Sequence, residues 1–326
     1  MSQIHQFVFP APPSMFPDIE SLLHQTLREP PIDYSILKEY PLVFFEQHSD
    51  KNVSGGSLVG RIDDTIATHL SLLIRNFVIA DGTVVLRIGF VSNVATQPHW
   101  QKMGYMTATF KQLDSIAEKH DLDALLLWGD LSKFYQNLGY MSLGREQRYH
   151  LSRSLLTHYQ TVLGELMQKR TIKTEVRQIK NAELSEEQFR DLNKLRPPQK
   201  MNCHRTVAEF RNLIMIPDTY IYCCFSGTTP VAYAVMGRGK DFIGVIHEWG
   251  SLNFFHLHET INTVFASSLF SEILLLSPAD LPQEFSIGLR SFSEKIELLP
   301  MAMAKVFNSK IKAELEEIFV WGLDSI

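Results

Sequence analysis

The sequence of 326 residues predicts a mixed α/β protein built from two domains in tandem. An apolar strand at residues 83–91 runs through a short loop into an amphipathic helix at residues 104–120. The continuous apolar run at residues 124–128 is typical of a strand that is buried on both faces, as parallel strands are. The second half repeats a similar order of strands and helices, and the length suits two domains of common size.

Hydrophobic periodicity and turn residues place the elements of the first half. Pro30 and Pro31 end the first helix, and Asp81-Gly82 indicates a hairpin turn. A helix that Gly139 closes follows the buried strand at residues 124–128. We expect strands at residues 6–9, 42–45, 68–79 and 140–151, helices at residues 13–28 and 132–138, and a strand or turn at residues 58–62.

The second half begins after a helical connector at residues 152–172. Ser185 and Gln188 have the spacing of a capping box, and Pro197 limits the helix that they start. We expect strands at residues 174–179, 220–225, 231–236, 244–252, 272–276 and 319–321, and helices at residues 186–195, 205–215, 256–269 and 310–318. The predicted domains are therefore residues 1–151 and 173–326.

Composition excludes several classes of protein. The net charge of −5 and the isoelectric point of about 6.2 argue against a general nucleic-acid or anionic-membrane surface, which needs a basic face. Only three cysteines are present, without the spacing of a zinc site, so we expect no metal. No secretory signal or membrane-spanning apolar run is visible, which predicts a cytoplasmic protein.

The loop between the strand at 83–91 and the following helix has the features of an anion site. It contains Pro98 and Gly104 and leads directly into the first turn of the helix. The first N–H groups of a helix have no internal partner, and the helix dipole adds partial positive charge there. Gly104 has no Cβ, so a ligand can approach its backbone closely.

Two blocks of this region resemble the GNAT N-acetyltransferases. Gln101-x-x-Gly104-x-Met106 looks like the pyrophosphate-binding signature of that family, although Met106 stands where a small residue is usual. Lys133-Phe134-Tyr135-Gln136-Asn137-Leu138-Gly139-Tyr140 matches the family's second block, about thirty residues later. The resemblance implies the GNAT fold and transfer of an acetyl group from acetyl-CoA to an amine. It covers residues 83–150 of the chain.

The resemblance also implies roles for individual residues. Tyr135 would protonate the departing CoA thiolate, and Ser132 would either contact the cofactor or cap its own helix. The amine would attack the thioester directly in a ternary complex. The residues that would bind acetyl-CoA are Val94, Ala95, Thr96, Gln101, Lys102, Met103, Gly104, Tyr105, Met106, Thr107 and Ser132.

The general base is open at this stage, because the strand before the loop offers Ser92 and Asn93 and no carboxylate. The candidates are Glu248, Asp130 and, by resemblance to multidomain GNAT enzymes, the carboxylate of Ile326. We read His247-Glu248 as a hydrogen-bonded core pair, and His256 and His258 as a solvated helix start.

After the strand at 244–252 the sequence has no Gln-x-x-Gly, so we interpret the second half as a degenerate GNAT-like domain. The alternative function is a non-catalytic acyl-CoA-binding or regulatory protein, which Met106 and the missing base favour.

Overall fold

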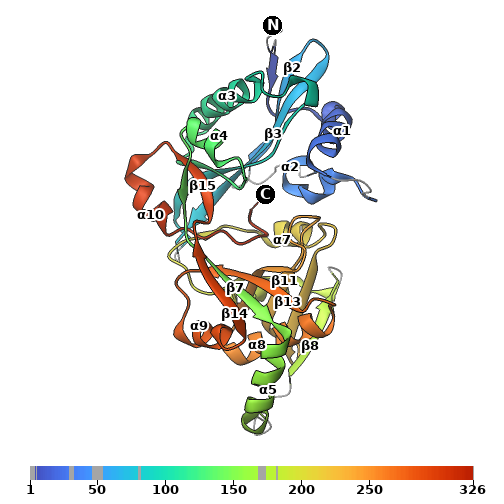
Figure 1. Cartoon of the computed structure of the whole chain (residues 1–326), viewed down its shortest axis with the longest axis vertical. Helices are drawn as coiled ribbons and strands as arrows, with labels where there is room; N and C mark the ends of the chain where they lie inside the picture. Colours follow the sequence, from blue (N-terminus) through green and yellow to red (C-terminus); the bar gives the residue numbers. More distant parts are fainter. Residues whose placement is uncertain are drawn as a thin grey trace.

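The computed structural model describes residues 4, 6–28, 33–45, 54–79, 82–167, 174–180 and 183–325. Two mixed β-sheets lie one above the other, each with helices packed against it (Figure 1). The predicted mixed α/β class is confirmed. Among the described residues, no helix is long and apolar enough to cross a membrane.

The first sheet has the strand order β1-β2-β3-β4-β5-β15-β6, and β9 pairs with β3. Its strands are β1 (Gln6–Val8), β2 (Ser54–Ile62), β3 (Thr65–Val78), β4 (Val84–Thr96), β5 (Ala124–Leu127), β6 (Met141–Leu143), β9 (Asn202–Cys203) and β15 (Ala302–Val306). Helices α1 (Phe16–Leu27), α2 (Pro41–Phe44), α3 (Tyr105–Lys119) and α4 (Ser132–Asn137) belong to this half. Consecutive strand residues point to opposite faces, so Leu73 joins the core with α1 while Leu72 joins the core with α3.

The second sheet has the strand order β14-β7-β13-β12-β11-β10-β8. Its strands are β7 (Glu146–Ser152), β8 (Thr174–Ile179), β10 (Tyr220–Ser226), β11 (Thr229–Met236), β12 (Val245–Ser251), β13 (Glu272–Pro278) and β14 (Ser293–Leu299). The remaining helices are α5 (Arg153–Met167), α6 (Glu186–Lys194), α7 (Val207–Leu213), α8 (Phe254–Ala266), α9 (Gln283–Arg290) and α10 (Lys312–Glu316). The predicted capping box of Ser185 and Gln188 is present at the start of α6.

The two halves exchange strands. β7 lies between β13 and β14 of the second sheet, with Glu146 opposite both Pro278 and Leu299. In return β15, near the end of the chain, lies between β5 and β6 of the first sheet, with Met303 opposite both Leu127 and Ser142. Sheet membership therefore differs from the sequential division into residues 1–151 and 173–326, and the predicted connector at 152–172 contains α5.

Three local predictions are wrong. Residues 42–45 form α2 instead of a strand, because Pro41 occupies its first position, where proline favours a helix. Residues 140–151 form two strands in different sheets, β6 and β7. They are separated at Gly144, whose φ of 75° and closeness to Ile318 O exclude a side chain. Residues 319–321 are an irregular buried segment, and α9, β14 and β15 were not predicted. Asp81 of the predicted hairpin turn lies outside the described residues.

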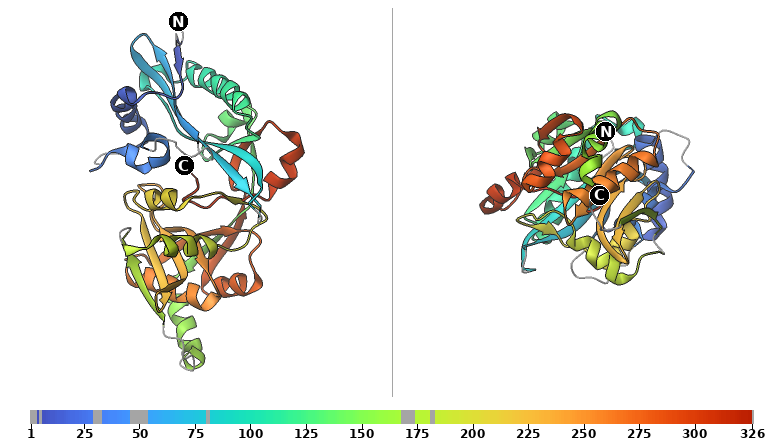
Figure 2. Two further views of the ribbon diagram at one scale, coloured as in Figure 1. Left: turned by 180° about the vertical axis from the view of Figure 1, so that it is seen from behind. Right: turned by 90° about the horizontal axis from the view of Figure 1, so that it is seen from below.

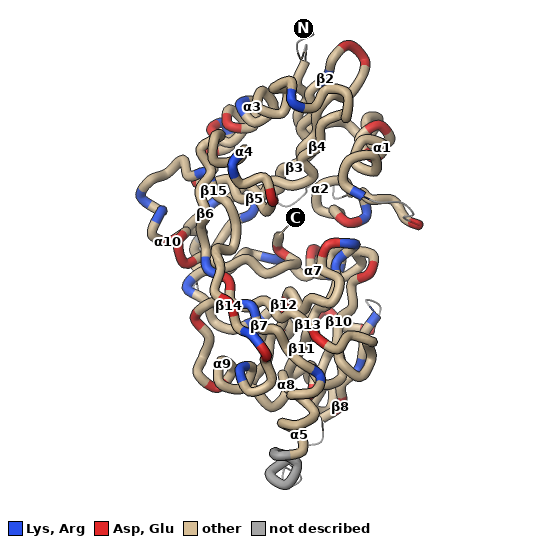
Figure 3. The backbone as a smooth tube through the Cα atoms, in the orientation of Figure 1, with Lys and Arg blue, Asp and Glu red and all other residues tan. Residues whose placement is uncertain are grey.

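The last described residues, 319–325, return to the junction of the two halves. Figures 1 and 2 show this end of the chain between the two sheets, far from the N-terminal strand. Trp321 and Leu323 are fully enclosed, so the segment is part of the core. Basic and acidic residues are interspersed along both halves (Figure 3).

Candidate functional site

The site begins where β4 and β5 separate. These strands pair in parallel from Ile88 opposite Ala124 to Val91 opposite Leu127, and the pairing ends there. β4 continues to Thr96 with β3 as its partner, but its register shifts between the Ser71–Ser92 and His69–Ala95 pairs. This irregularity leaves Asn93 with a φ of 51°, and such bulges bend and twist a strand. Among the described residues, β3 is then the only strand that pairs with residues 94–96.

A buried histidine holds this bulge. His69 Nδ1 lies 2.9 Å from the carbonyl oxygen of Asn93, and Nε2 lies 3.0 Å from Ser57 Oγ. Burial lowers the pKa of His69 to about 4, although the bond to Asn93 opposes the shift, so the ring is neutral at pH 7. Because a carbonyl only accepts, Nδ1 donates to Asn93 and Nε2 accepts from the Ser57 hydroxyl. The Asn93 side chain donates to Ser71 Oγ at 3.2 Å, which fixes the bulge from both ends.

A cavity of about 750 Å³ opens at this gap and extends to the second half of the chain. Its size lies within the usual range of small-molecule sites. The first half contributes the β4 bulge, residues 91–94, and the end of β5 with residues 128–131. The second half contributes Glu146, Arg148 and Arg238, and the C-terminal segment contributes Val320, Gly322 and Ser325. Both halves therefore build one site.

The predicted anion loop follows β4 directly. Gln101, Lys102, Met103 and Gly104 are exposed, and Gln101 Nε2 donates to Thr96 O at 3.3 Å. Gly104 precedes α3 with a φ of 85° and no side-chain cap, and a Cβ built on it meets no atom within 4 Å. The loop thus presents the start of a 15-residue helix to open space, as an anion site requires.

The other predicted cofactor residues lie on either side of this loop. Val94 and Thr96 are half-buried and Ala95 is buried on β4, while Tyr105 is buried and Thr107 half-buried on α3. Met106 packs against the apolar core beneath α3. Ser132 is an exposed first residue of α4, and no side-chain cap is formed there, so its predicted capping role is wrong. The assignment of these residues to the cofactor stays a prediction.

Tyr135 faces the cavity from α4. Its ring packs edge-on against Phe110, Phe134 and Tyr140, and only 6% of the residue is exposed. Burial raises the pKa of Tyr135 above its ordinary value, and the nearby Asp130 carboxylate adds to the shift. The phenol is therefore protonated at neutral pH and able to donate a proton.

The candidates for the general base differ in burial and in their position relative to the cavity. Glu248 is fully buried and accepts from Arg205 and Tyr233, as the predicted core pair requires, while Asp130 is exposed at the cavity. Ile326 lies outside the described residues. Sequence reasoning missed Glu146, which lines the cavity, is 5% exposed and accepts from Arg148 Nε at 2.7 Å. Burial raises the pKa of Glu146, and Arg148 offsets only part of that rise.

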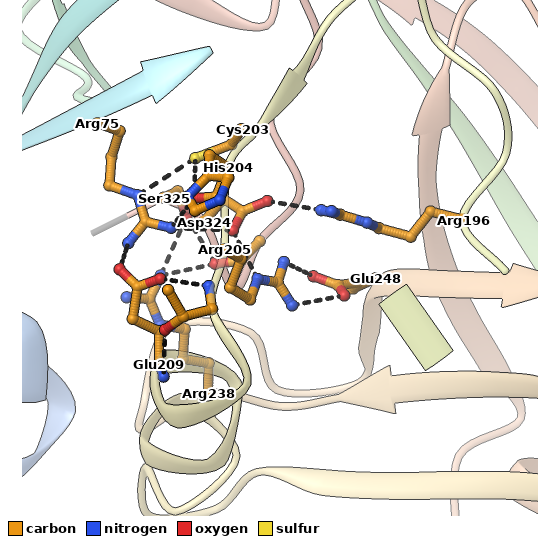
Figure 4. A network of polar contacts seen from close by, with 12 residues as sticks. Arg75, Arg196, Cys203, His204, Arg205, Glu209, Arg238, Glu248, Asp324 and Ser325 are labelled. Atoms are coloured by element: carbon orange, nitrogen blue, oxygen red, sulfur yellow. Dashed lines mark hydrogen bonds and ion pairs between the residues drawn. The ribbon is translucent and has the colours of Figure 1, made fainter. Parts of the chain in front are cut away.

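A buried ionic network fixes the C-terminal segment at the cavity (Figure 4). Asp324 has no exposed surface and lies 2.8 Å from Arg205 Nε, 2.9 Å from Arg196 Nη1 and 3.7 Å from Arg75 Nη2. Arg205 also binds Glu248 through two nitrogens. Burial alone would raise the pKa of Asp324, but the three guanidinium groups outweigh it and hold the pKa below its ordinary value. Because Arg75 belongs to β3, the network joins both halves.

In the second half, the space between the corresponding strands, β12 and β13, is filled by side chains. β12 and β13 pair in parallel only at Val245–Leu274 and Ile246–Leu275. Beyond them the Trp249 indole donates to Leu276 O at 3.1 Å and packs against Trp321. α8 is capped by its own Asn253, whose Oδ1 accepts from His256 N. This half thus lacks the open helix start of the first, as the degenerate motif predicts.

The prediction that His256 and His258 form a solvated helix start is wrong. His256 and His258 are both buried on α8, and His258 packs against Tyr159, Phe254 and Phe292. An aromatic core surrounds His258 because α8 lies against α5 and the start of β14. No cluster of three or more possible metal ligands occurs among the described residues.

Comparison with known proteins agrees with this geometry. The family model described as an acetyltransferase (GNAT) domain matches residues 33–142. The comparison with curated protein sequences gave no match.

Solved structures extend the likeness in fold over more than nine-tenths of the chain. A probable N-acyltransferase from Enterococcus faecalis is 12% identical with a TM-score of 0.62, covering 93% of this chain and 73% of that one. A GCN5-related N-acetyltransferase from Anabaena variabilis is 13% identical with a TM-score of 0.62, covering 94% and 74%. A tandem GNAT protein from the clavulanic acid biosynthesis pathway is 11% identical with a TM-score of 0.52, covering 92% and 96%. At these identities the likeness establishes the tandem GNAT fold, which acyl-CoA-dependent acyltransferases use.

Proposed function

We propose that the protein is an N-acetyltransferase that moves the acetyl group of acetyl-CoA to an amine by direct attack in a ternary complex. The observation that carries the proposal is the cavity at the separation of β4 and β5, with the Tyr135 phenol in its wall. Its position between both halves supports a site that admits the thioester from the first half and the amine from the second.

The donor end is assigned to the loop and the open strand edge. The N–H groups of residues 101–107 and the dipole of α3 suit a pyrophosphate, and Lys102 adds a full positive charge. The open edge of Val94, Ala95 and Thr96 suits an extended amide chain such as pantetheine, because an unpaired strand edge offers N–H and C=O groups in alternation. Met106 packs against the apolar core beneath α3 with part of its side chain.

We assign Glu146 as the general base for the amine and Tyr135 as the general acid for the departing thiolate. Glu146 takes a proton from the substrate ammonium, and the neutral nitrogen attacks the thioester carbon. As the carbon–sulfur bond breaks, Tyr135 donates its proton to the thiolate, which leaves as CoA. A raised pKa suits Glu146 as a base, because its proton affinity then lies closer to that of the amine.

The test follows thiol release from acetyl-CoA with a panel of amines, together with mass spectrometry of the products. Acetylated amine and free CoA in equal amounts are the expected outcome. Acetyl-CoA at a hundredfold excess over its dissociation constant should also stabilise the fold by about 2.7 kcal/mol. Stabilisation without turnover across the panel would favour the non-catalytic acyl-CoA-binding alternative. The absence of both stabilisation and turnover would refute the cofactor site.

A further inference from the structure

Arg238 differs from the other arginines near the junction of the two halves. Arg75 pairs with Glu209, Arg205 with Glu248 and Asp324, and Arg28 with Glu39. Arg238, only 5% exposed, forms no ion pair with the described residues. Burial lowers the pKa of Arg238, and the nearby Asp241, Glu39 and Asp324 carboxylates, none of which pairs with it directly, offset only part of this shift. The direct partners of Arg28, Arg75 and Arg205 instead raise the pKa of those arginines.

Neutral groups hold Arg238 in the wall of the cavity. Its Nη1 donates to the carbonyl oxygen of Gly322 at 2.8 Å and to Ser325 Oγ at 3.0 Å, and both residues line the same cavity. A guanidinium carries five N–H donors in a planar fork that matches a carboxylate. These two bonds occupy one nitrogen of Arg238, and a buried cation without a directly bonded anion is costly. An anionic group in the cavity would supply that partner.

We infer that the acceptor is an amine that also bears a carboxylate, an amino acid or a small peptide, with its carboxylate bound by Arg238. The inference rests on the proposed function and names its substrate class. Glu146 lies in the same cavity with the opposite charge, so the site offers a carboxylate to the ammonium end and a guanidinium to the carboxylate end. A zwitterionic amine satisfies both, whereas a simple amine leaves Arg238 without a directly bonded anion.

The experiment compares matched amines that differ only at the carboxylate, such as alanine with alaninamide and glycylglycine with its amide. For the wild-type protein, kcat/KM should be about 10- to 100-fold higher for the acid of each pair, the value expected for hydrogen bonds between charged groups. Arg238→Gln should remove this preference, and Arg238→Lys should retain part of it. Because Arg238 also holds Gly322 and Ser325, the measured quantity is the ratio of kcat/KM for acid and amide within each variant, and the melting temperature controls for folding.

The outcomes separate this inference from the proposed function. Acetylation of no amine at all would refute the proposed function. Equal rates for acid and amide in the wild-type protein, or a preference that survives Arg238→Gln, would overturn the assignment of Arg238. A stronger preference for aminophosphonates over amino acids would overturn the carboxylate as the bound group. If Arg238→Gln also loses the amides and melts early, Arg238→Lys decides, because it keeps the charge and loses the fork.

Discussion

Replacing Asp324 with asparagine removes a negative charge from between three arginines while keeping the size of the side chain. Asp324 has no exposed surface, and its oxygens lie 2.8 Å from Arg205 and 2.9 Å from Arg196. Breaking a buried ion pair from one side costs about 3–5 kcal/mol, because the partner charge stays buried. Glu248 continues to neutralise Arg205 in the variant. We therefore expect the free energy of unfolding to fall by an amount near the lower end of that range.

Urea unfolding at pH 7 measures this loss, with Asp191→Asn as the control. Asp191 pairs with Lys194 at 2.9 Å on the surface of α6, where such a pair contributes about 0–1 kcal/mol. The acceptor KM should also rise in Asp324→Asn, because the segment that Asp324 anchors supplies Val320, Gly322 and Ser325 to the cavity. Acetyl-CoA affinity should change little, since the loop at 101–104 belongs to the first half.

The pH dependence gives a second check on the same variant. The pKa of Asp324 is lowered by folding, so its contribution is present above the unfolded pKa and disappears as the pH falls through the folded pKa. The difference in the free energy of unfolding between wild type and variant should be constant from pH 7 to 5. It should shrink below about pH 4, near the pKa of an unfolded aspartate. A difference below 1 kcal/mol at pH 7, or one that grows in acid, would refute the reasoning.

Three further substitutions test the site. Gly104→Val should weaken acetyl-CoA binding at least tenfold in a titration, whereas Gly227→Val, at another exposed glycine with positive φ, should cost similar stability and leave binding intact. Tyr135→Phe should lower kcat by up to about 10²-fold at unchanged acetyl-CoA affinity, and unchanged kcat would leave Tyr135 as a packing residue. Glu146→Gln should lower kcat. In the wild-type protein, activity should fall at acidic pH as Glu146 becomes protonated, and the variant should lose this fall. A fall in activity at acidic pH that persists in the variant would argue against Glu146 as the base.

The sequence predicted the parts of the site that local pattern determines. The strand at 83–91, the loop around Gly104 and the helix that follows are neighbours in the chain, so periodicity and turn residues suffice to place them. Short apolar runs were ambiguous, and residues 42–45 and 319–321 were both assigned to strands because apolar character alone does not distinguish a strand from a buried helix or segment.

The missing parts of the site depend on distant pairing. β15 joins β5 across some 180 residues, and no feature of its own five residues specifies a sheet in the other half. Glu146 and Arg238 reach the cavity only because β7 and β11 belong to the second sheet. Neither residue stands in a motif, so a charged side chain next to an apolar strand was the only local signal. The ionic network at Asp324 likewise brings together residues from four separate regions.

The strand exchange determines how the chain can be divided. A cut within residues 168–173 gives an N-terminal fragment without β15 and a C-terminal fragment without β7. Each fragment then lacks a strand that pairs on both sides, which leaves long unpaired edges of the kind that aggregate. We expect neither fragment to fold alone, whereas the two refolded together should form a 1:1 complex that binds acetyl-CoA. Circular dichroism, gel filtration and a binding titration follow the outcome. A C-terminal fragment that folds cooperatively by itself would show that β7 is dispensable to the second sheet.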